Sequence, residues 1–134
     1  MEEDITVQVE AEINPTEDEA KVKSAMENIF GSLQFEVKPL KRGSLLTAKT
    51  RGTAGLTKLY NLLRRDRIRD ATRSVLNKGT SGHSIVFYLN KQVAYAGHVS
   101  FSQPSGESPL GPIRVEIRCQ DPRKIIDWLA PRTA

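Results

Sequence analysis

The chain has 134 residues, enough for one domain with a buried core, and its hydrophobic share of 38% is ordinary for a soluble protein. Its single cysteine, Cys119, excludes an internal disulfide, and no apolar run reaches the roughly 20 residues that cross a bilayer. The acidic start Glu2-Glu3-Asp4 is unlike a signal peptide. We therefore expect a single domain over residues 1–134, located in the cytoplasm, with no membrane partner.

The formal net charge of +4 is divided unevenly along the chain. Residues 1–36 contain ten acidic and two basic residues, whereas residues 37–134 contain eighteen basic and six acidic ones. Such a concentration of positive charge attracts polyanions. An ordinary solvated surface, or acidic and basic parts that meet within one molecule, would also explain the asymmetry.

The first half of the chain predicts strands around one helix. Apolar residues alternate with polar ones, as in half-buried strands, in residues 5–13, 33–37 and 44–51. Thr16 and Glu19 have the spacing of a capping box, and they precede an amphipathic helix that Gly31 can end.

An interrupted helical region comes next. The apolar residues of 56–63 and those of 68–75 lie on faces that differ by about 100° at 3.6 residues per turn. We therefore expect a kink or break near residues 64–67, with Asp66 as the N-cap of a second helix and Gly79 as the residue that closes the region.

The last third predicts a hairpin, a strand and a helix. β-Branched and aromatic residues in 84–89 and 92–101 flank Asn90-Lys91, which is typical of a hairpin. Residues 113–117 alternate, and Asp121-Pro122 begins the final helix. The predicted class is α+β, in the order β-α-β-β-α-α-β-β-β-α, with an antiparallel or mixed sheet and helices packed on one face.

Five arginines fall within residues 63–73, and their planar donors suit phosphate oxygens. On a continuous helix, Arg65, Arg69 and Arg73 form one stripe, while an apolar stripe of Ile68, Ala71 and Val75 faces the core. Pairing with Asp66 and Asp70 would neutralise two of the five charges and leave an excess of three.

The sequence therefore predicts a non-catalytic, RNA-binding module that contacts the phosphate backbone through this helix. The candidate contacts are Arg64, Arg65, Arg67, Arg69, Arg73, Lys41, Arg42, Arg51 and Lys58, with Lys49 nearby. The alternative is a protein-interaction or self-association module, a homo-oligomer in which the acidic N-terminal third meets the basic remainder of another copy.

No cofactor, metal or catalytic residue is predicted. If Asn90-Lys91 forms a two-residue turn, His83 and His98 pair across the hairpin, but no third or fourth metal ligand accompanies them. There is no Walker motif, dinucleotide fingerprint or nucleophile elbow.

Three segments together resemble a family of small archaeal proteins of unknown function. They are residues 63–73, the block SIVFYLNKQVAYAGHVSF at 84–101, and SPLGPI at 108–113. That family carries a predicted RNA-binding label and is similar in fold to the large-subunit ribosomal protein that binds 5S rRNA. The resemblance implies an α+β fold and an RNA partner, and it brings no catalytic residues.

Overall fold

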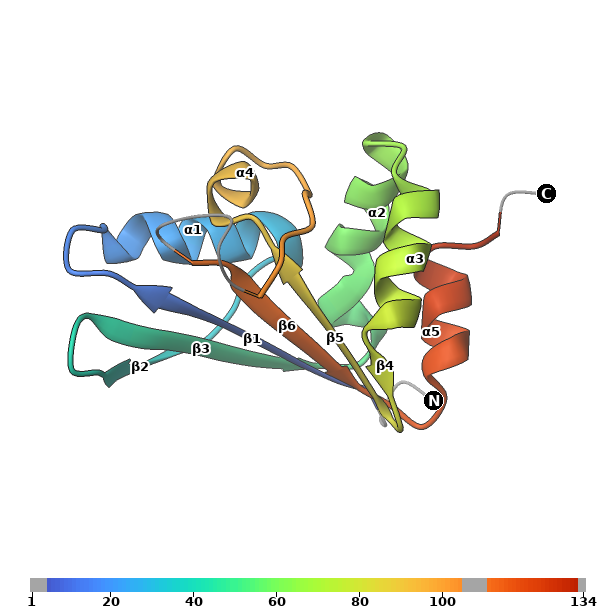
Figure 1. Cartoon of the computed structure of the whole chain (residues 1–134), viewed down its shortest axis with the longest axis horizontal. Coiled ribbons are helices and arrows are strands. Elements are labelled where there is room, and N and C mark those ends of the chain that lie inside the picture. The colour runs from blue at the N-terminus through green and yellow to red at the C-terminus, as the bar shows by residue number, and fades with distance from the viewer. Residues whose placement is uncertain (1–4, 105–110, 133–134) are drawn as a thin grey trace.

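A computed structural model describes residues 5–104 and 111–132 of the chain (Figure 1). The strands form one antiparallel sheet in the order β2-β3-β1-β6-β5-β4. They are β1 (Thr6–Ile13), β2 (Phe35–Pro39), β3 (Ser44–Arg51), β4 (Thr80–Ser81), β5 (Ser84–Leu89) and β6 (Ile113–Arg118). The predicted α+β class is confirmed, in the order β-α-β-β-α-α-β-β-α-β-α.

The helices gather on one face of the sheet, as the strand patterns predict (Figure 1). They are α1 (Glu19–Phe30), the short 3₁₀ helix η2 (Thr53–Leu56), α2 (Thr57–Arg65), α3 (Arg69–Lys78), α4 (Lys91–Tyr95) and α5 (Pro122–Leu129). No helix in the described part of the chain is both long and apolar enough to cross a membrane.

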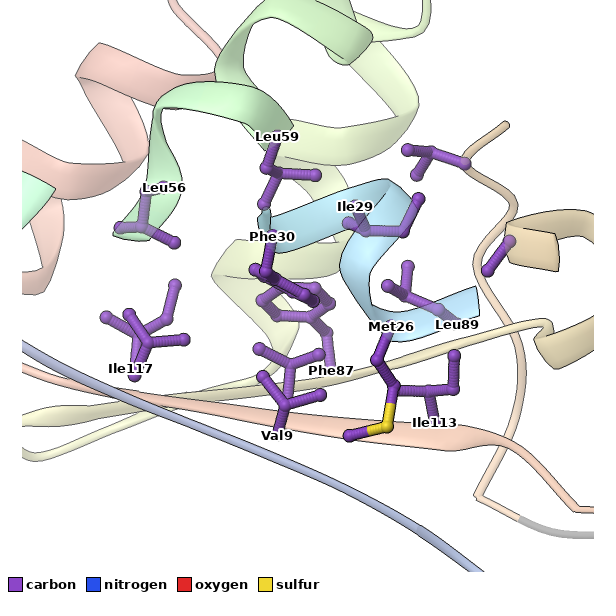
Figure 2. Close-up of a cluster of buried hydrophobic side chains, with 14 of the residues drawn as sticks. Val9, Met26, Ile29, Phe30, Leu56, Leu59, Phe87, Leu89, Ile113 and Ile117 are labelled. Atoms are coloured by element: carbon purple, nitrogen blue, oxygen red, sulfur yellow. The ribbon is translucent and has the colours of Figure 1, made fainter. Parts of the chain in front are cut away.

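The core lies between the sheet and these helices. Alternate residues of β1, β5 and β6 are buried, while their neighbours face the other way and stay partly exposed. Figure 2 shows Met26, Ile29 and Phe30 of α1 lying over Val9 and Phe87 of the sheet. Burying apolar area of this kind is the main favourable contribution to folding.

The first helix is capped by a different residue from the predicted one. Asp18 is the N-cap of α1, and its carboxylate accepts a hydrogen bond from the Ala20 amide at 2.9 Å, so the capping box of Thr16 and Glu19 is wrong. Gly31 ends the helix at φ 82°, a conformation that glycine adopts without steric cost.

The predicted hairpin around Asn90-Lys91 is also wrong. Asn90 accepts a hydrogen bond from the Val93 amide at 3.0 Å and thereby begins α4, so the chain turns into a helix after β5. The return segment meets the sheet again through the isolated pair Leu89–Phe101. A local side-chain cap has outweighed β propensity here.

The break between α2 and α3 is confirmed, but its chemistry differs from the prediction. Ile68, and not Asp66, is the N-cap of α3, and Asp66 caps the end of α2. Arg67 lies between them at φ 55°, the one non-glycine residue with positive φ in residues 5–104 and 111–132. Because the helix turns here, Ala71 is exposed, and Thr72 and Leu76 are the buried side chains of α3.

Gly79 ends α3 as predicted, although its φ of −86° is one that any residue could adopt. A Cβ at this position would overlap the carbonyl oxygen of Val86, and the Val86 amide donates to Gly79 at 2.9 Å. The glycine is therefore needed for the close approach of α3 to β5.

A buried ion pair attaches α4 to the rest of the fold. The Lys91 ammonium, on a residue that is 4% exposed, donates to the Glu12 carbonyl at 2.7 Å and to the Glu17 carboxylate at 3.0 Å. Burial alone would raise the pKa of Glu17, but hydrogen bonds from Asn14 and the charge of Lys91 outweigh it and lower the pKa below the usual 4.5.

We expect Lys91→Met to lower the free energy of unfolding by about 3 kcal/mol at pH 7, because it leaves the Glu17 carboxylate without its cation. The pKa of Glu17 is lowered in the folded protein, so the stabilisation is complete above pH 4.5 and is lost as the pH falls through the folded pKa. Urea unfolding at pH 7 and pH 3.5 measures both effects. Lys21→Met, at an exposed lysine of α1, is the control and should change little; an equal loss in the two variants would contradict the prediction.

Candidate nucleic-acid interface

The predicted arginine stripe does not exist on one helix. Arg65 ends α2, whereas Arg69 and Arg73 belong to α3. The left-handed conformation of Arg67 changes the direction of the chain between them, so the i, i+4, i+8 relation no longer defines one face. The five arginines differ instead in what their guanidinium groups contact.

Arg64 is held by the C-terminal end of α5. Its guanidinium lies 3.6 Å from the centre of the Tyr60 ring, which itself stacks on Trp128 at 4.8 Å. The same group donates to the carbonyls of Leu129 at 3.0 Å and Trp128 at 3.1 Å. Helix ends leave such carbonyls without partners, and a cation there also complements the helix dipole.

Arg73 completes this contact from α3. Its side chain is 16% exposed, and it forms an ion pair with Asp127 at 2.8 Å. It also donates to the Ala130 carbonyl at 3.0 Å, next to the two carbonyls that Arg64 binds. Arg64 and Arg73 therefore hold α2, α3 and α5 together, and their donors are largely used within the protein.

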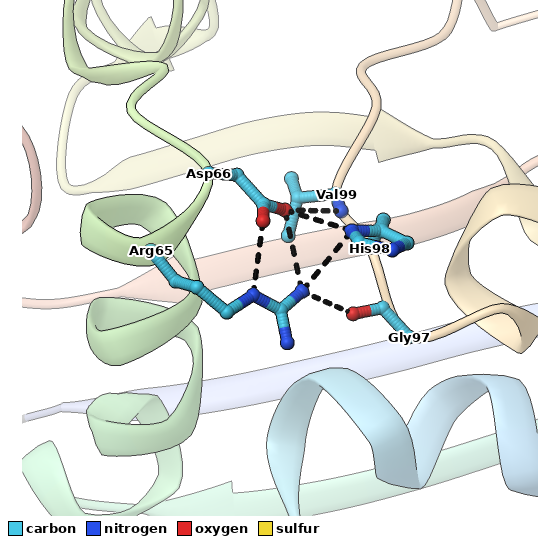
Figure 3. A network of polar contacts seen from close by, with 5 residues as sticks. All are labelled: Arg65, Asp66, Gly97, His98 and Val99. Carbon is cyan, nitrogen blue, oxygen red and sulfur yellow. Dashed lines mark hydrogen bonds and ion pairs between the residues drawn. The ribbon is translucent and has the colours of Figure 1, made fainter.

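Arg65 takes part in a network that joins the end of α2 to the segment after α4 (Figure 3). It donates to the Asp66 carboxylate at 3.0 Å, to the Gly97 carbonyl at 2.6 Å and to His98 Nδ1 at 3.2 Å. Asp66 also accepts from the Val99 amide at 3.4 Å. The hydrogen bond from Arg65 is the chief cause that lowers the pKa of Asp66.

Arg67 and Arg69 differ from the other three. Both are exposed, as Arg65 is too, but neither side chain makes a hydrogen bond or ion pair with a residue that the structure describes. They line a surface depression of about 620 Å³ at the link between α2 and α3, together with Ile68 and Asp70. We call residues 66–69 the α2–α3 corner, and its two exposed guanidinium groups are available to an anion.

The four remaining candidates lie elsewhere. Lys58 donates to the Glu27 carbonyl at 3.0 Å, at the end of α1. Lys41 and Arg42 are exposed in the turn between β2 and β3, at the left of Figure 1, whereas the α2–α3 corner is at the upper right. Arg51 ends β3 on the sheet. The nine predicted residues therefore do not form one patch.

Arg118 is not among the residues predicted from the sequence, and it lies two strands from Arg51. Thr6 of β1 pairs with Arg51 on one side and with Arg118 on the other. The alternation of β6 was a signal that Arg118 points away from the core, but the strand order decides that it is near Arg51. Strand order could not be read from the sequence, because β3, β1 and β6 are far apart in the chain.

Part of the charge asymmetry is explained inside the molecule. Strand β1, in the acidic third of the chain, pairs with β3 and β6 from the basic remainder. Glu10 lies 3.9 Å from Arg114, and Glu17 binds the buried Lys91. Acidic and basic parts thus meet within one copy, which is one of the explanations that the sequence left open.

The histidines do not form a pair. His98 contacts Asp66 at 3.5 Å, and the main chain of His83 accepts from the Cys119 amide. Among the described residues, no group of three or more metal-ligating side chains comes together. Residues 105–110, which include the first half of the SPLGPI segment, lie outside the described part of the chain.

A family model described as RNA binding matches residues 6–119. A UPF0201 protein of Thermococcus kodakarensis is 50% identical over 129 residues, which cover 95% of this chain and 90% of that protein. A UPF0201 protein of Pyrobaculum neutrophilum is 46% identical over 128 residues, with 95% and 90% coverage.

Two solved structures are similar to this chain in fold. The crystal structure of a UPF0201 protein from Methanococcus jannaschii has a TM-score of 0.86 and 38% identity, and the match covers 96% of this chain and 95% of that one. The crystal structure of a DUF54 protein from Archaeglobus fulgidus has a TM-score of 0.68 and 25% identity, with 92% coverage of each chain.

We expect Arg64 and Arg73 to differ from Arg69 in their effect on stability. Arg64→Ala and Arg73→Ala should each lower the free energy of unfolding by roughly 1–3 kcal/mol, because each leaves carbonyls at the end of α5 without a donor. Arg69→Ala, at an exposed side chain with no described partner, is the control and should change stability by less than about 0.5 kcal/mol. Urea denaturation followed by circular dichroism measures all three. Equal losses of unfolding free energy at the three positions would show that the internal contacts of Arg64 and Arg73 do not stabilise the fold.

Proposed function

The chain belongs to the UPF0201 family, and from that membership we propose that it is a non-catalytic RNA-binding protein whose α2–α3 corner contacts the phosphate backbone. The RNA-binding description of the matching family model supports the choice of RNA. Relatives from archaea support the expected resemblance to a family of small archaeal proteins. The fold likeness to the ribosomal protein that binds 5S rRNA stays a prediction.

The observation that carries this proposal is the exposure of two guanidinium groups, those of Arg67 and Arg69, at one turn of the chain. Arginine binds phosphate through paired donors, and a donor that no internal acceptor occupies is ready to do so. A non-glycine residue in the left-handed region costs on the order of 1 kcal/mol, and such residues concentrate at functional sites.

The other three arginines support the corner by fixing its position. Arg64 and Arg73 bind the end of α5, and Arg65 ties the end of α2 to Gly97. Because the backbone of the corner is already fixed, binding does not have to bear the entropy cost of ordering it. Contacts to phosphate carry no direct sequence information, so binding should be weakly sequence-specific.

We expect the double variant Arg67→Asn/Arg69→Gln to bind a labelled single-stranded RNA roughly tenfold more weakly than the wild-type protein at low salt. Asparagine tolerates the left-handed conformation, so the backbone at position 67 is preserved. The slope of log affinity against log salt should fall by about 1.4, since each phosphate contact to a single strand contributes about 0.7. Fluorescence anisotropy measures both quantities.

The matched control is Arg123→Gln/Lys124→Gln, which removes two exposed charges from the first turn of α5. Its affinity should stay close to that of the wild-type protein. The RNA should also be recovered at full length on a gel, as expected of a protein without catalytic activity. No detectable binding by the wild-type protein, a flat response to salt, or cleavage of the RNA would each count against this proposal.

Self-association is the second candidate, and one observation favours it. Strand β2 is at an edge of the sheet, and Val37 and Leu40 are 44% and 38% exposed there. Exposed apolar edge strands can pair with another chain. A dimer formed in this way should persist in size-exclusion chromatography at high salt and be lost in Val37→Lys, whereas one held by charge would dissociate as salt rises. A monomer at every protein concentration would exclude it.

A further inference from the structure

We propose that one end of the uncovered sheet face is a second RNA-contact surface, which holds a single strand of RNA through Lys49, Arg51 and Arg118. This inference rests on the proposed RNA-binding function and adds a surface to it. We call the side of the sheet opposite the helices the open face, and its end at Thr6 and Gln8 the basic end. Thr6 and Gln8 belong to β1, the strand that lies between β3 and β6.

The strand register places the three cations together. In the first row across the sheet, Arg51, Thr6, Arg118 and Ser84 are cross-strand neighbours. Adjacent strands are about 4.8 Å apart, so Arg51 and Arg118 lie about 10 Å apart on either side of Thr6. Lys49 is two residues along β3 from Arg51, about 7 Å away on the same face.

The second row contains the one acid that the described residues place at the basic end. It runs through Lys49, Gln8, Glu116 and Val86. Glu116 accepts from Arg118 Nε at 3.0 Å and from Arg114 at 3.3 Å, and the hydrogen bond from Arg118 is the chief cause that lowers its pKa. Three cations face one carboxylate, so these two rows keep a net charge of two positive. The side chain of Arg118 is still 70% exposed, and Lys49 and Arg51 are exposed as well.

A hollow in the surface joins these residues. Its volume is about 590 Å³, and six of its seven lining residues belong to the two rows: Thr6, Gln8, Lys49, Arg51, Glu116 and Arg118. Sites of this size hold small ligands or parts of larger ones. The neutral polar side chains Thr6 and Gln8 lie between the cations, where they could hydrogen-bond a base edge or a 2′-hydroxyl.

The rest of the open face limits where phosphates can bind. The third row contains Glu10, Arg114 and Tyr88, and the charge of Arg114 is shared by Glu10 and Glu116. Glu36 lies in this row as well, and in the next row Glu12 is matched by Lys38, so the rows beyond the basic end carry no excess of positive charge. A polyanion is therefore attracted to the basic end.

Tyr88 favours a single strand over a duplex. It is partly exposed in the third row, and its cross-strand neighbour is Arg114. An unpaired base can stack on a tyrosine ring while the neighbouring phosphates contact the cations, whereas the bases of a duplex already stack on one another. Aromatic and basic side chains together on one sheet face are a known means of holding single-stranded RNA.

The test is binding of a fluorescein-labelled twelve-nucleotide oligouridylate to the full chain. In the face variant Lys49→Gln/Arg51→Gln/Arg118→Gln we expect affinity to fall at least tenfold and the salt slope to fall by about 2, as three lost contacts to a single strand predict. A preformed RNA duplex of the same length should compete poorly. Tyr88→Leu should weaken binding severalfold without changing the salt slope.

The matched control is Lys38→Gln/Lys41→Gln/Arg42→Gln, which removes three exposed charges at the opposite end of the same sheet. Circular dichroism confirms that each variant is folded before its binding is measured. Affinity of the control should stay within about twofold of the wild-type value, because the sites it changes are outside the two rows.

Three outcomes would overturn the inference. If wild-type protein binds the oligonucleotide and the face variant binds as well as the control, the basic end is no contact surface, while the proposed RNA-binding function stands. If the duplex competes as well as a single strand, the commitment to single-stranded RNA is wrong. If wild-type protein does not bind RNA, the proposed function fails and this inference fails with it.

Discussion

The contact between two arginines and the end of α5 determines how three helices are held together and which arginines stay available to a ligand. A helix ends with carbonyls that have no partner of their own, and Arg64 and Arg73 supply donors for those of Trp128, Leu129 and Ala130. These bonds join α2, α3 and α5, which lie side by side over one half of the sheet (Figure 1). Guanidinium groups used in this way are no longer free to bind an anion.

The arginine-rich segment therefore contains, within a few residues, arginines that hold the fold together and arginines that have no internal partner. Arg64, Arg65 and Arg73 bind acceptors within the protein, whereas the exposed side chains of Arg67 and Arg69, where the chain turns, have no partner among the described residues. The turn itself separates the two groups, because the positive φ of Arg67 ends one helix and redirects the next. A continuous helix would have placed all five arginines on one rod, with their charges repelling one another.

The same separation of charge is seen in the sheet. Strand β1 carries acids from the N-terminal third into the middle of a basic sheet, and Glu10 and Arg114 meet there. One end of the open face keeps Lys49, Arg51 and Arg118 with a single acid among the described residues, while the next two rows carry no excess of positive charge. The overall charge of +4 is thus a poor guide to the surface, since the local balance depends on which strands are neighbours.

The sequence by itself determined the α+β class, the buried faces of the strands and of α1, and the break between α2 and α3. These follow from hydrophobic periodicity, which is a local property of the chain. It did not determine that residues 91–95 form a helix, since that depends on the cap of Asn90 and on the distant partners of Lys91. Nor could it show which arginines bind acceptors within the protein, because the acceptors of Arg64 and Arg73 are more than fifty residues away. It could not place Arg118 near Arg51 either, because the order of strands is fixed by tertiary packing.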